Sequence, residues 1–309
     1  MAPADRSLKA NASRPGGQLL RPMGDVTLMR LFILPPLILL ALFNVFPLLW
    51  SLFLSFSNFI AKNPMVWGKN PLMVGLKNYR QILADPEMWE RFITTGKYVV
   101  LSVSIEMIFG FALALMLWKR GNGAGLIQVI LVLPMTMSPV IVGLMWKLFM
   151  DPNWGMLNFL LGLRKVDWIQ DPNLNFYSIV MVDVWMWTPF VMLLSYAGLT
   201  AIPEYLYEAA EVDRASWWFT FRHVTLPLVF PLLLVAVIFR VIEAFKIFDL
   251  PMGITGKGSA APPLLTYKLY NISFLSWRTG LGGALGYIML VITIMVTNVF
   301  VKYLNKAKQ

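Results

Sequence analysis

Six long apolar runs limit what this chain can fold into more than any other feature of its sequence. Each run can supply the roughly 20 helical residues that cross about 30 Å of hydrocarbon at 1.5 Å per residue. Only 14% of the 309 residues are charged, against about 25% in an ordinary soluble domain. The sequence therefore predicts one all-α membrane domain with six transmembrane helices over residues 28–309. The runs are, approximately, Leu31 to Phe56, Phe92 to Trp118, Leu126 to Met150, Phe176 to Leu199, Leu228 to Phe248 and Leu281 to Tyr303.

Residues 1–27 carry basic, Pro and Gly residues with little apolar content, so we expect a basic, disordered tail. Basic residues directly beside the span ends favour a cytoplasmic N-terminus, and six spans then place both termini in the cytoplasm. Because the basic residues mostly lie between spans, the net charge of +10 indicates a multi-pass protein in contact with membrane lipid and no nucleic acid. The flanking residues are Arg30, Lys119, Arg120, Lys302, Lys306 and Lys308.

Several ionisable residues fall inside the predicted spans, where each costs about 2.5–3.5 kcal/mol at the bilayer centre. Arg240, Glu243, Lys246 and Asp249 recur every three residues, so we expect them along one side of a single helix. Such a stripe faces protein or water rather than lipid. It either forms an internal salt-bridge ladder or lines a substrate pathway, and both can hold at once.

The fourth span places Asp183 beside two tryptophans, Trp185 and Trp187, in the sequence DVWMWTPF. Pro189 loosens a helix there and frees backbone carbonyls. Flat indole faces and charged hydrogen-bonding groups suit a polyhydroxylated ligand, although tryptophan in a membrane protein also serves packing or the interfacial belt. We therefore take one set of residues as the candidate substrate pathway: Asp183, Trp185, Trp187, Arg240, Glu243 and Lys246.

Sequence features of catalysis and metal binding argue against an enzyme. The chain has no cysteine and a single histidine, His223, which predicts no metal site. The stretch GITGKGS superficially resembles a phosphate-binding loop, but Lys257 is followed by Gly258 rather than by Ser or Thr. We expect a transport subunit without an ATPase motif of its own.

The polar segment of residues 201–226 interrupts the apolar runs and favours a short cytoplasmic helix. It reads EAAEVDRA from Glu208 to Ala215, with Leu226-Pro227 and Pro231 downstream. This pattern closely resembles the EAA motif of ATP-binding-cassette (ABC) importer permeases, with its spacing kept. One position departs, because Arg214 stands where the family expects glycine. Further stretches, such as VGLKNYRQIL from Val74, resemble the binding-protein-dependent sugar branch, similar to the maltose and glycerol-phosphate permeases.

The resemblance implies a type I importer permease in the bacterial cytoplasmic (inner) membrane, with a coupling helix in the 201–226 loop. The implied partners are a second homologous permease, an ATPase subunit dimer and an extracytoplasmic substrate-binding protein. ATP and Mg would belong to the ATPase, with no cofactor in this chain. The implied cargo is a sugar, polyol or sugar derivative, and Arg240 or Lys246 could favour an anionic sugar. The ATPase-coupling residues would be Glu208, Ala209, Ala210, Asp213, Arg214 and Ala215.

Two alternatives stay open at this stage. Intramembrane carboxylates commonly carry protons, so Glu106 and Asp183 could form the relay of a proton-gradient-driven secondary transporter. A membrane scaffold without transport activity is the other alternative.

Overall fold

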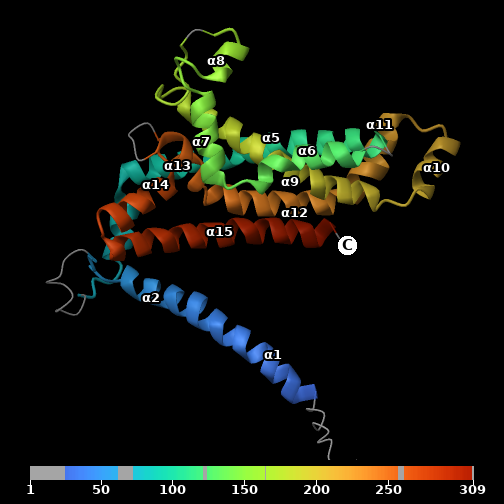
Figure 1. Cartoon of the computed structure of the whole chain (residues 1–309). Coiled ribbons are helices and arrows are strands. Elements are labelled where there is room, and N and C mark those ends of the chain that lie inside the picture. Colours follow the sequence, from blue (N-terminus) through green and yellow to red (C-terminus); the bar gives the residue numbers. More distant parts are fainter. Residues whose placement is uncertain (1–24, 62–71, 121–123, 164, 257–260, 308–309) are drawn as a thin grey trace, which may run out of the picture. The chain divides into compact units, whose positions relative to one another are not determined.

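The computed structural model describes residues 25–61, 72–120, 124–163, 165–256 and 261–307, and these fold as helices joined by turns (Figure 1). The chain divides into two compact units, residues 1–51 and 52–309. Most of the predicted tail, residues 1–24, lies outside the described residues. The helices before the bundle are α1 (Asp25–Leu40), the π-helical turn η1 (Ala41–Val45) and α2 (Phe46–Ser55).

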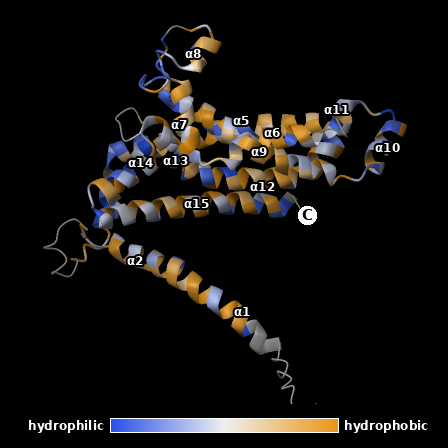
Figure 2. Cartoon of the chain, viewed as in Figure 1, coloured by the Kyte–Doolittle hydropathy of each residue, from blue (hydrophilic) through white to orange (hydrophobic). Residues whose placement is uncertain are grey.

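The first predicted span, Leu31 to Phe56, corresponds to the observed helical span Arg30–Ser55, most of which lies in the first unit and which runs on into the start of the second. The chain stays helical through Pro35 and Pro36, and the π-helical turn joins α1 to α2 without a break. Its side chains are almost all apolar, as Figure 2 shows for the first helices. This length and composition suit a membrane span.

The second unit is a bundle built on four long helices, which the sequence predicts because each contains a strongly apolar stretch long enough to cross a membrane. Helix α9 packs against α5 and α12, and α12 also packs against α15. Buried residues of α5, α9 and α12 form the centre of the core. The long helices are α5 (Pro86–Arg120), α9 (Asn175–Thr200), α12 (Leu226–Phe245) and α15 (Thr279–Ala307).

The third predicted span differs from the expected single helix over Leu126 to Met150. Two helices, α6 (Ala124–Thr136) and α7 (Pro139–Phe149), meet at an angle of 96°. Ser138 adopts an extended conformation, as expected for the residue before a proline, and Pro139 opens α7 at its first position. The described residues therefore contain five helices able to span a membrane, or six if the bent pair counts as one span.

Short helices cap the two ends of the bundle (Figure 1). At one end lie α10 (Tyr205–Val212) and α11 (Trp217–Thr220), followed by the π-helical turn η2 (Phe221–Thr225) that leads into α12. At the opposite end lie α13 (Asp249–Thr255), α14 (Leu265–Tyr270) and α4 (Lys77–Ala84). The remaining short elements are α8 (Met156–Leu160) and the π-helical turn η3 (Asn271–Leu275).

Helices α7 and α13 touch backbone to backbone. A Cβ atom on Gly143 would lie 2.6 Å from the Leu250 carbonyl oxygen, and one on Gly253 would lie 2.6 Å from the Val140 carbonyl oxygen. Only glycine permits so close an approach. The contact fixes α13 against α7, and the ends of both helices border the cavity described below.

Candidate functional site

Three ionisable side chains from three different helices meet inside the bundle. Arg240 of α12 donates from Nε to Glu106 Oε2 at 2.6 Å and from Nη2 to Glu106 Oε1 at 2.8 Å. The same Nη2 donates to Asp183 Oδ2 of α9 at 3.0 Å. All three side chains are at most 2% exposed. The paired, bidentate geometry is what allows charges to be buried at membrane depth.

A cavity of about 90 Å³ lies beside this ionic triad. Asp183, Trp187 and Arg240 form part of its wall, and the Arg240 guanidinium carbon lies 4.8 Å from the centre of the Trp187 ring. This is a cation–π distance, and it holds the indole in place at the cavity. Glu243 and Lys246 line the cavity as well.

Helix breaks border the same cavity. Pro139, the first residue of α7, lies on one side. Ile247 and Phe248, which separate α12 from α13, lie on another. Non-helical backbone at membrane depth is tolerated where it lines a cavity or is buried in protein, and broken helices commonly build midplane substrate sites. The Ile247 carbonyl is satisfied by the Thr266 hydroxyl of α14, at 2.5 Å.

The cavity brings together five of the six residues predicted for the substrate pathway: Asp183, Trp187, Arg240, Glu243 and Lys246. The sixth, Trp185, is outside the set that lines the cavity, and its ring packs edge-on against Trp146 at 5.5 Å. The reason is helical: residues 183 and 187 are four apart and share a face of α9, whereas residue 185 lies on the other side.

The prediction that Arg240, Glu243, Lys246 and Asp249 lie along one side of a single helix is wrong in part. Helix α12 ends at Phe245, so Lys246 is its C-cap and Asp249 begins the separate helix α13. Arg240 points into the bundle, whereas Glu243 and Lys246 pair with each other at 3.0 Å and are both more than half exposed. No continuous ladder forms among these residues. The chain turns after Phe245, and that turn places Asp249 beside the cavity.

Glu106 was absent from the predicted pathway set, although it holds Arg240 through two hydrogen bonds. Its signal in the sequence is a lone carboxylate within an apolar run, which needs a buried partner. The sequence pattern alone could not identify that partner, because Glu106 and Arg240 are 134 residues apart along the chain.

The EAA-like segment forms the predicted short helix, α10, and the departure at Arg214 has a clear geometry. Arg214 has a φ of +52°, the left-handed conformation that glycine would adopt without strain. The Ala215 amide donates to the Ala210 carbonyl at 2.9 Å, and the Arg214 amide donates to the Glu211 carbonyl at 3.0 Å. These two bonds form a Schellman motif. Arginine, in the position of the expected glycine, thus adopts the backbone conformation that glycine favours.

Tyr207 anchors α10 to the bundle. Its ring lies 5.1 Å from that of Trp118 at the end of α5, and its hydroxyl is 3.1 Å from the Thr225 hydroxyl in η2. The outer side of the segment is open: Glu208, Ala209, Asp213 and Arg214 are exposed, while Ala210 and Ala215 are half-buried. The helix is therefore held on one side and presents acidic and small residues on the other.

Several named transport proteins are similar in sequence to this chain. The trehalose/maltose transport system permease protein MalF of Thermococcus litoralis is 35% identical over 282 residues, covering 88% of this chain and 92% of that protein. The trehalose transport system permease protein SugA of Mycobacterium tuberculosis is 31% identical, covering 98% and 95%. The sulfoquinovosyl glycerol transport system permease protein SmoG of Agrobacterium fabrum is 31% identical, covering 92% of each.

A solved structure of a bacterial ABC transporter involved in the import of the acidic polysaccharide alginate contains a chain of the same fold. The TM-score is 0.79 at 20% identity, with 91% of this chain and 96% of that chain covered. The family model described as "binding-protein-dependent transport system inner membrane component" matches residues 106–308, which include the triad, the cavity and α10. The chain therefore belongs to the family of inner-membrane permease components of binding-protein-dependent ABC transporters.

Proposed function

We propose that this chain forms half of the translocation pathway of an ATP-driven importer for a sugar or sugar derivative, and that a second homologous permease supplies the other half. The cargoes in the names of the similar permeases support this cargo class: trehalose, maltose and sulfoquinovosyl glycerol. Family membership favours the ATP-driven mechanism over the proton-driven one. In the structure, Glu106 and Asp183 are both held by Arg240, which suits a structural or pathway role better than a relay.

The observation that carries the proposal is the position of α10. The helix lies at one end of the bundle (Figure 1), exposes Glu208 and Ala209, and is tied through Tyr207 to both α5 and the start of α12. A push or pull on such a helix moves two spans together as a rigid body. We infer that α10 inserts into a cytoplasmic ATPase subunit, one of a pair that binds ATP and Mg. The same end of the bundle, and both chain termini, would then face the cytoplasm.

Within this proposal, the cavity beside the triad is a closed section of the sugar pathway. Its volume of about 90 Å³ is below the roughly 300 Å³ at which small-molecule pockets begin. Transport therefore requires the walls at α7, α12 and α13 to separate. An extracytoplasmic binding protein would deliver the sugar at the end of the bundle formed by α13 and α14.

Replacing Glu208 by Lys tests the coupling role. Reversing a charge buried at an interface costs about 2–5 kcal/mol, so we expect trehalose uptake per ATP hydrolysed to fall at least about tenfold. The measurement is uptake of labelled trehalose into proteoliposomes that contain the complete transporter with its ATPase and binding protein. The matched control is Glu90→Lys, which makes the same charge change at an exposed residue near the start of α5, at the end of the bundle opposite α10, and should keep most of the coupling.

Two outcomes would contradict the proposal. Normal coupled uptake by the Glu208→Lys variant would remove the role of α10. Uptake that follows an imposed proton gradient without nucleotide would instead support the gradient-driven mechanism through Glu106 and Asp183.

A further inference from the structure

A second, larger cavity lies at the end of the bundle opposite α10, away from the triad. Its volume is about 340 Å³, within the range of small-ligand pockets. Three basic side chains line it, Arg91, Lys268 and Arg278, against a single carboxylate, Asp85. Its floor is apolar and buried, and consists of Ile82, Met88, Ile272 and Leu281. A cavity with a cationic rim and an aliphatic floor favours an amphipathic anion.

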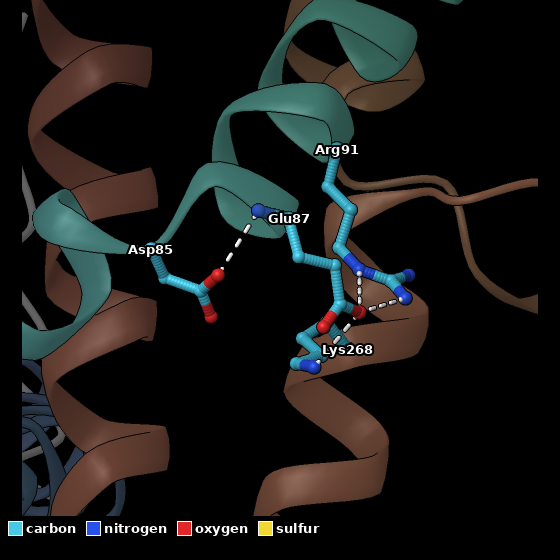
Figure 3. A network of polar contacts seen from close by, with 4 residues as sticks. All are labelled: Asp85, Glu87, Arg91 and Lys268. Atoms are coloured by element: carbon cyan, nitrogen blue, oxygen red, sulfur yellow. Dashed lines mark hydrogen bonds and ion pairs between the residues drawn. The ribbon is translucent and has the colours of Figure 1, made fainter.

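Asp85, which lines the cavity, and the nearby Glu87, which does not line it, already have structural partners (Figure 3). Glu87 Oε1 accepts from Arg91 Nη2 at 2.6 Å and from Lys268 Nζ at 3.0 Å, and so ties α14 to α5. Asp85 Oδ1 accepts the Glu87 backbone amide at 2.9 Å and caps the start of α5. The lysine ammonium and the arginine guanidinium each keep further N–H groups for a ligand.

Arg278 completes the rim as an exposed side chain with five N–H donors. Three neutral polar side chains, Gln81, Asn271 and Ser276, also line the cavity and can bond hydroxyl or ester oxygens. With Glu87, which pairs with Arg91 beside the cavity, the three cations face two carboxylates. The local net charge is then +1, which one negative charge on a ligand would balance.

An apolar groove of about 450 Å³ begins on the same first turns of α5. Its wall includes Phe92, Gly96 and Val100 of α5, together with side chains of α12 and α15. The polar groups at its edge are satisfied within the protein, because Trp89 Nε1 donates to the Leu83 carbonyl and the Thr293 hydroxyl donates to the Met289 carbonyl. The groove therefore offers a hydrocarbon chain apolar contact and no competing hydrogen bond.

The depths of the cavity and the groove match a membrane lipid. Trp89 is exposed at the start of α5, where interfacial tryptophans gather, and Arg91 lies half a turn further on. Gly96 and Val100 follow Arg91 by five and nine residues, or about 8–14 Å along the helix. The polar region of each leaflet is about 5–8 Å thick. A headgroup at the depth of Arg91 therefore places its acyl chain at the depth of Gly96 and Val100. The connection runs along the α5 face that carries Met88, which lines the cavity, and Phe92, which lines the groove one turn further on.

We propose that this charged cavity and the adjoining groove bind one anionic glycerophospholipid, with the phosphate among Arg91, Lys268 and Arg278 and one acyl chain in the groove. Charge complementarity selects an anionic headgroup, and the groove selects a membrane lipid over a soluble phosphate. The leaflet follows from the proposed orientation with α10 in the cytoplasm, which makes it the outer one. The binding itself requires only that the chain lies in a membrane.

The headgroup part is tested by native mass spectrometry of the detergent-solubilised full-length chain, titrated with phosphatidylglycerol or phosphatidylcholine of the same acyl chains. We expect one phosphatidylglycerol to be retained in preference to phosphatidylcholine. Arg278→Ser should weaken phosphatidylglycerol retention about fivefold, since each basic residue near a lipid surface contributes on the order of a factor of five. Arg80→Ser, an exposed arginine on nearby α4 that does not line the cavity, should change nothing.

The groove part is tested by filling it. A Cβ on Gly96 meets no atom within 4 Å, so Gly96→Leu places a side chain in the groove without a backbone clash. We expect this variant to lose retention of both lipids while keeping its thermal stability. Gly286→Leu is the matched control, because Gly286 lies on α15 with the same open space and does not line the groove. It should retain phosphatidylglycerol as the unaltered chain does.

Three results would overturn the proposal. Equal retention of the two lipids by the unaltered chain would exclude selection by the cations. Displacement of phosphatidylglycerol by millimolar glycerol 3-phosphate, with no effect of Gly96→Leu, would make the cavity a site for a soluble phosphate. A loss of thermal stability in Gly96→Leu at unchanged lipid retention would assign the groove to a protein segment. None of these readouts depends on transport, so this inference and the proposed function can fail separately.

Discussion

Arg214 shows how a single residue can depart from a motif and still keep its backbone. The left-handed conformation costs a non-glycine residue about 1–2 kcal/mol, and the Schellman hydrogen bonds at the end of α10 hold it there. Its side chain is exposed on the side of α10 that we assign to the ATPase. Under the proposed coupling role, we expect this side chain to contact the ATPase.

Replacing Arg214 by Gly or by Ala separates the turn from the contact. Arg214→Gly relieves the strain, so we expect it to raise the free energy of unfolding by up to about 1 kcal/mol. The unfolding temperature should rise slightly as a result. Arg214→Ala keeps the strain and removes the side chain, so it should show no such gain. If the arginine contacts the ATPase, both variants lower coupled ATPase activity equally. Full activity in both would leave the side chain without a role at the interface.

The ionic triad is the second residue-scale feature. Arg240 hydrogen-bonds two carboxyl groups, and removing one member of a buried pair costs about 3–5 kcal/mol because its partner is left buried and unpaired. We expect Arg240→Met to be destabilised by about that amount in thermal unfolding of the solubilised chain. Combining it with Glu106→Gln and Asp183→Asn removes all three charges and should restore most of the loss. A triple variant as unstable as Arg240→Met would show that packing, and not charge, dominates at this site.

At the scale of elements, the breaks in two apolar runs build the cavity. Pro134, Pro189 and Pro231 lie inside helices that continue past them, whereas Pro139 begins a new helix after a 96° bend. The difference lies in packing: α7 leaves the direction of α6 because it lies against α13 through Gly143 and Gly253. A proline in an apolar run thus permits a break, and the neighbouring helix determines whether one occurs.

Gly143→Ala tests this contact. The added Cβ would lie 2.6 Å from the Leu250 carbonyl oxygen and 2.9 Å from Gly253 Cα, so α7 and α13 must separate. Overpacking of this kind costs about 1–3 kcal/mol, which we expect as a lower unfolding temperature of the solubilised chain. Gly125→Ala is the control in the other half of the bent pair, since its Cβ meets nothing within 4 Å. Equal stability of the two variants would rule out the glycine contact as the cause of the bend.

At the scale of the whole bundle, the second unit connects its two ends through the same helices. Helix α5 carries Trp118 under α10, Glu106 in the triad and Arg91 at the charged cavity. Helix α12 follows the coupling segment at one end and supplies Arg240, Glu243 and the break before α13 at the other. Under the proposed coupling role, motion of α10 would reach the closed cavity through the helices α5 and α12.

The sequence by itself determined the class of this protein, most of the spans and the position of the short helix α10, because hydropathy, span length and the EAA-like spacing are local properties. All six runs are helical, although the third is bent, and α10 forms where the motif predicts it. The local pattern also marked the ionisable residues within the spans, since each is costly in lipid.

Only the tertiary structure decided which of those residues meet. Glu106, Asp183 and Arg240 come from three helices, and their pairing depends on how α5, α9 and α12 pack. The same packing put Trp187 at the cavity and Trp185 against Trp146, bent the third span, and ended α12 before the expected stripe was complete. Partners this far apart along the chain have no periodicity to reveal them, because their proximity is a property of the folded core.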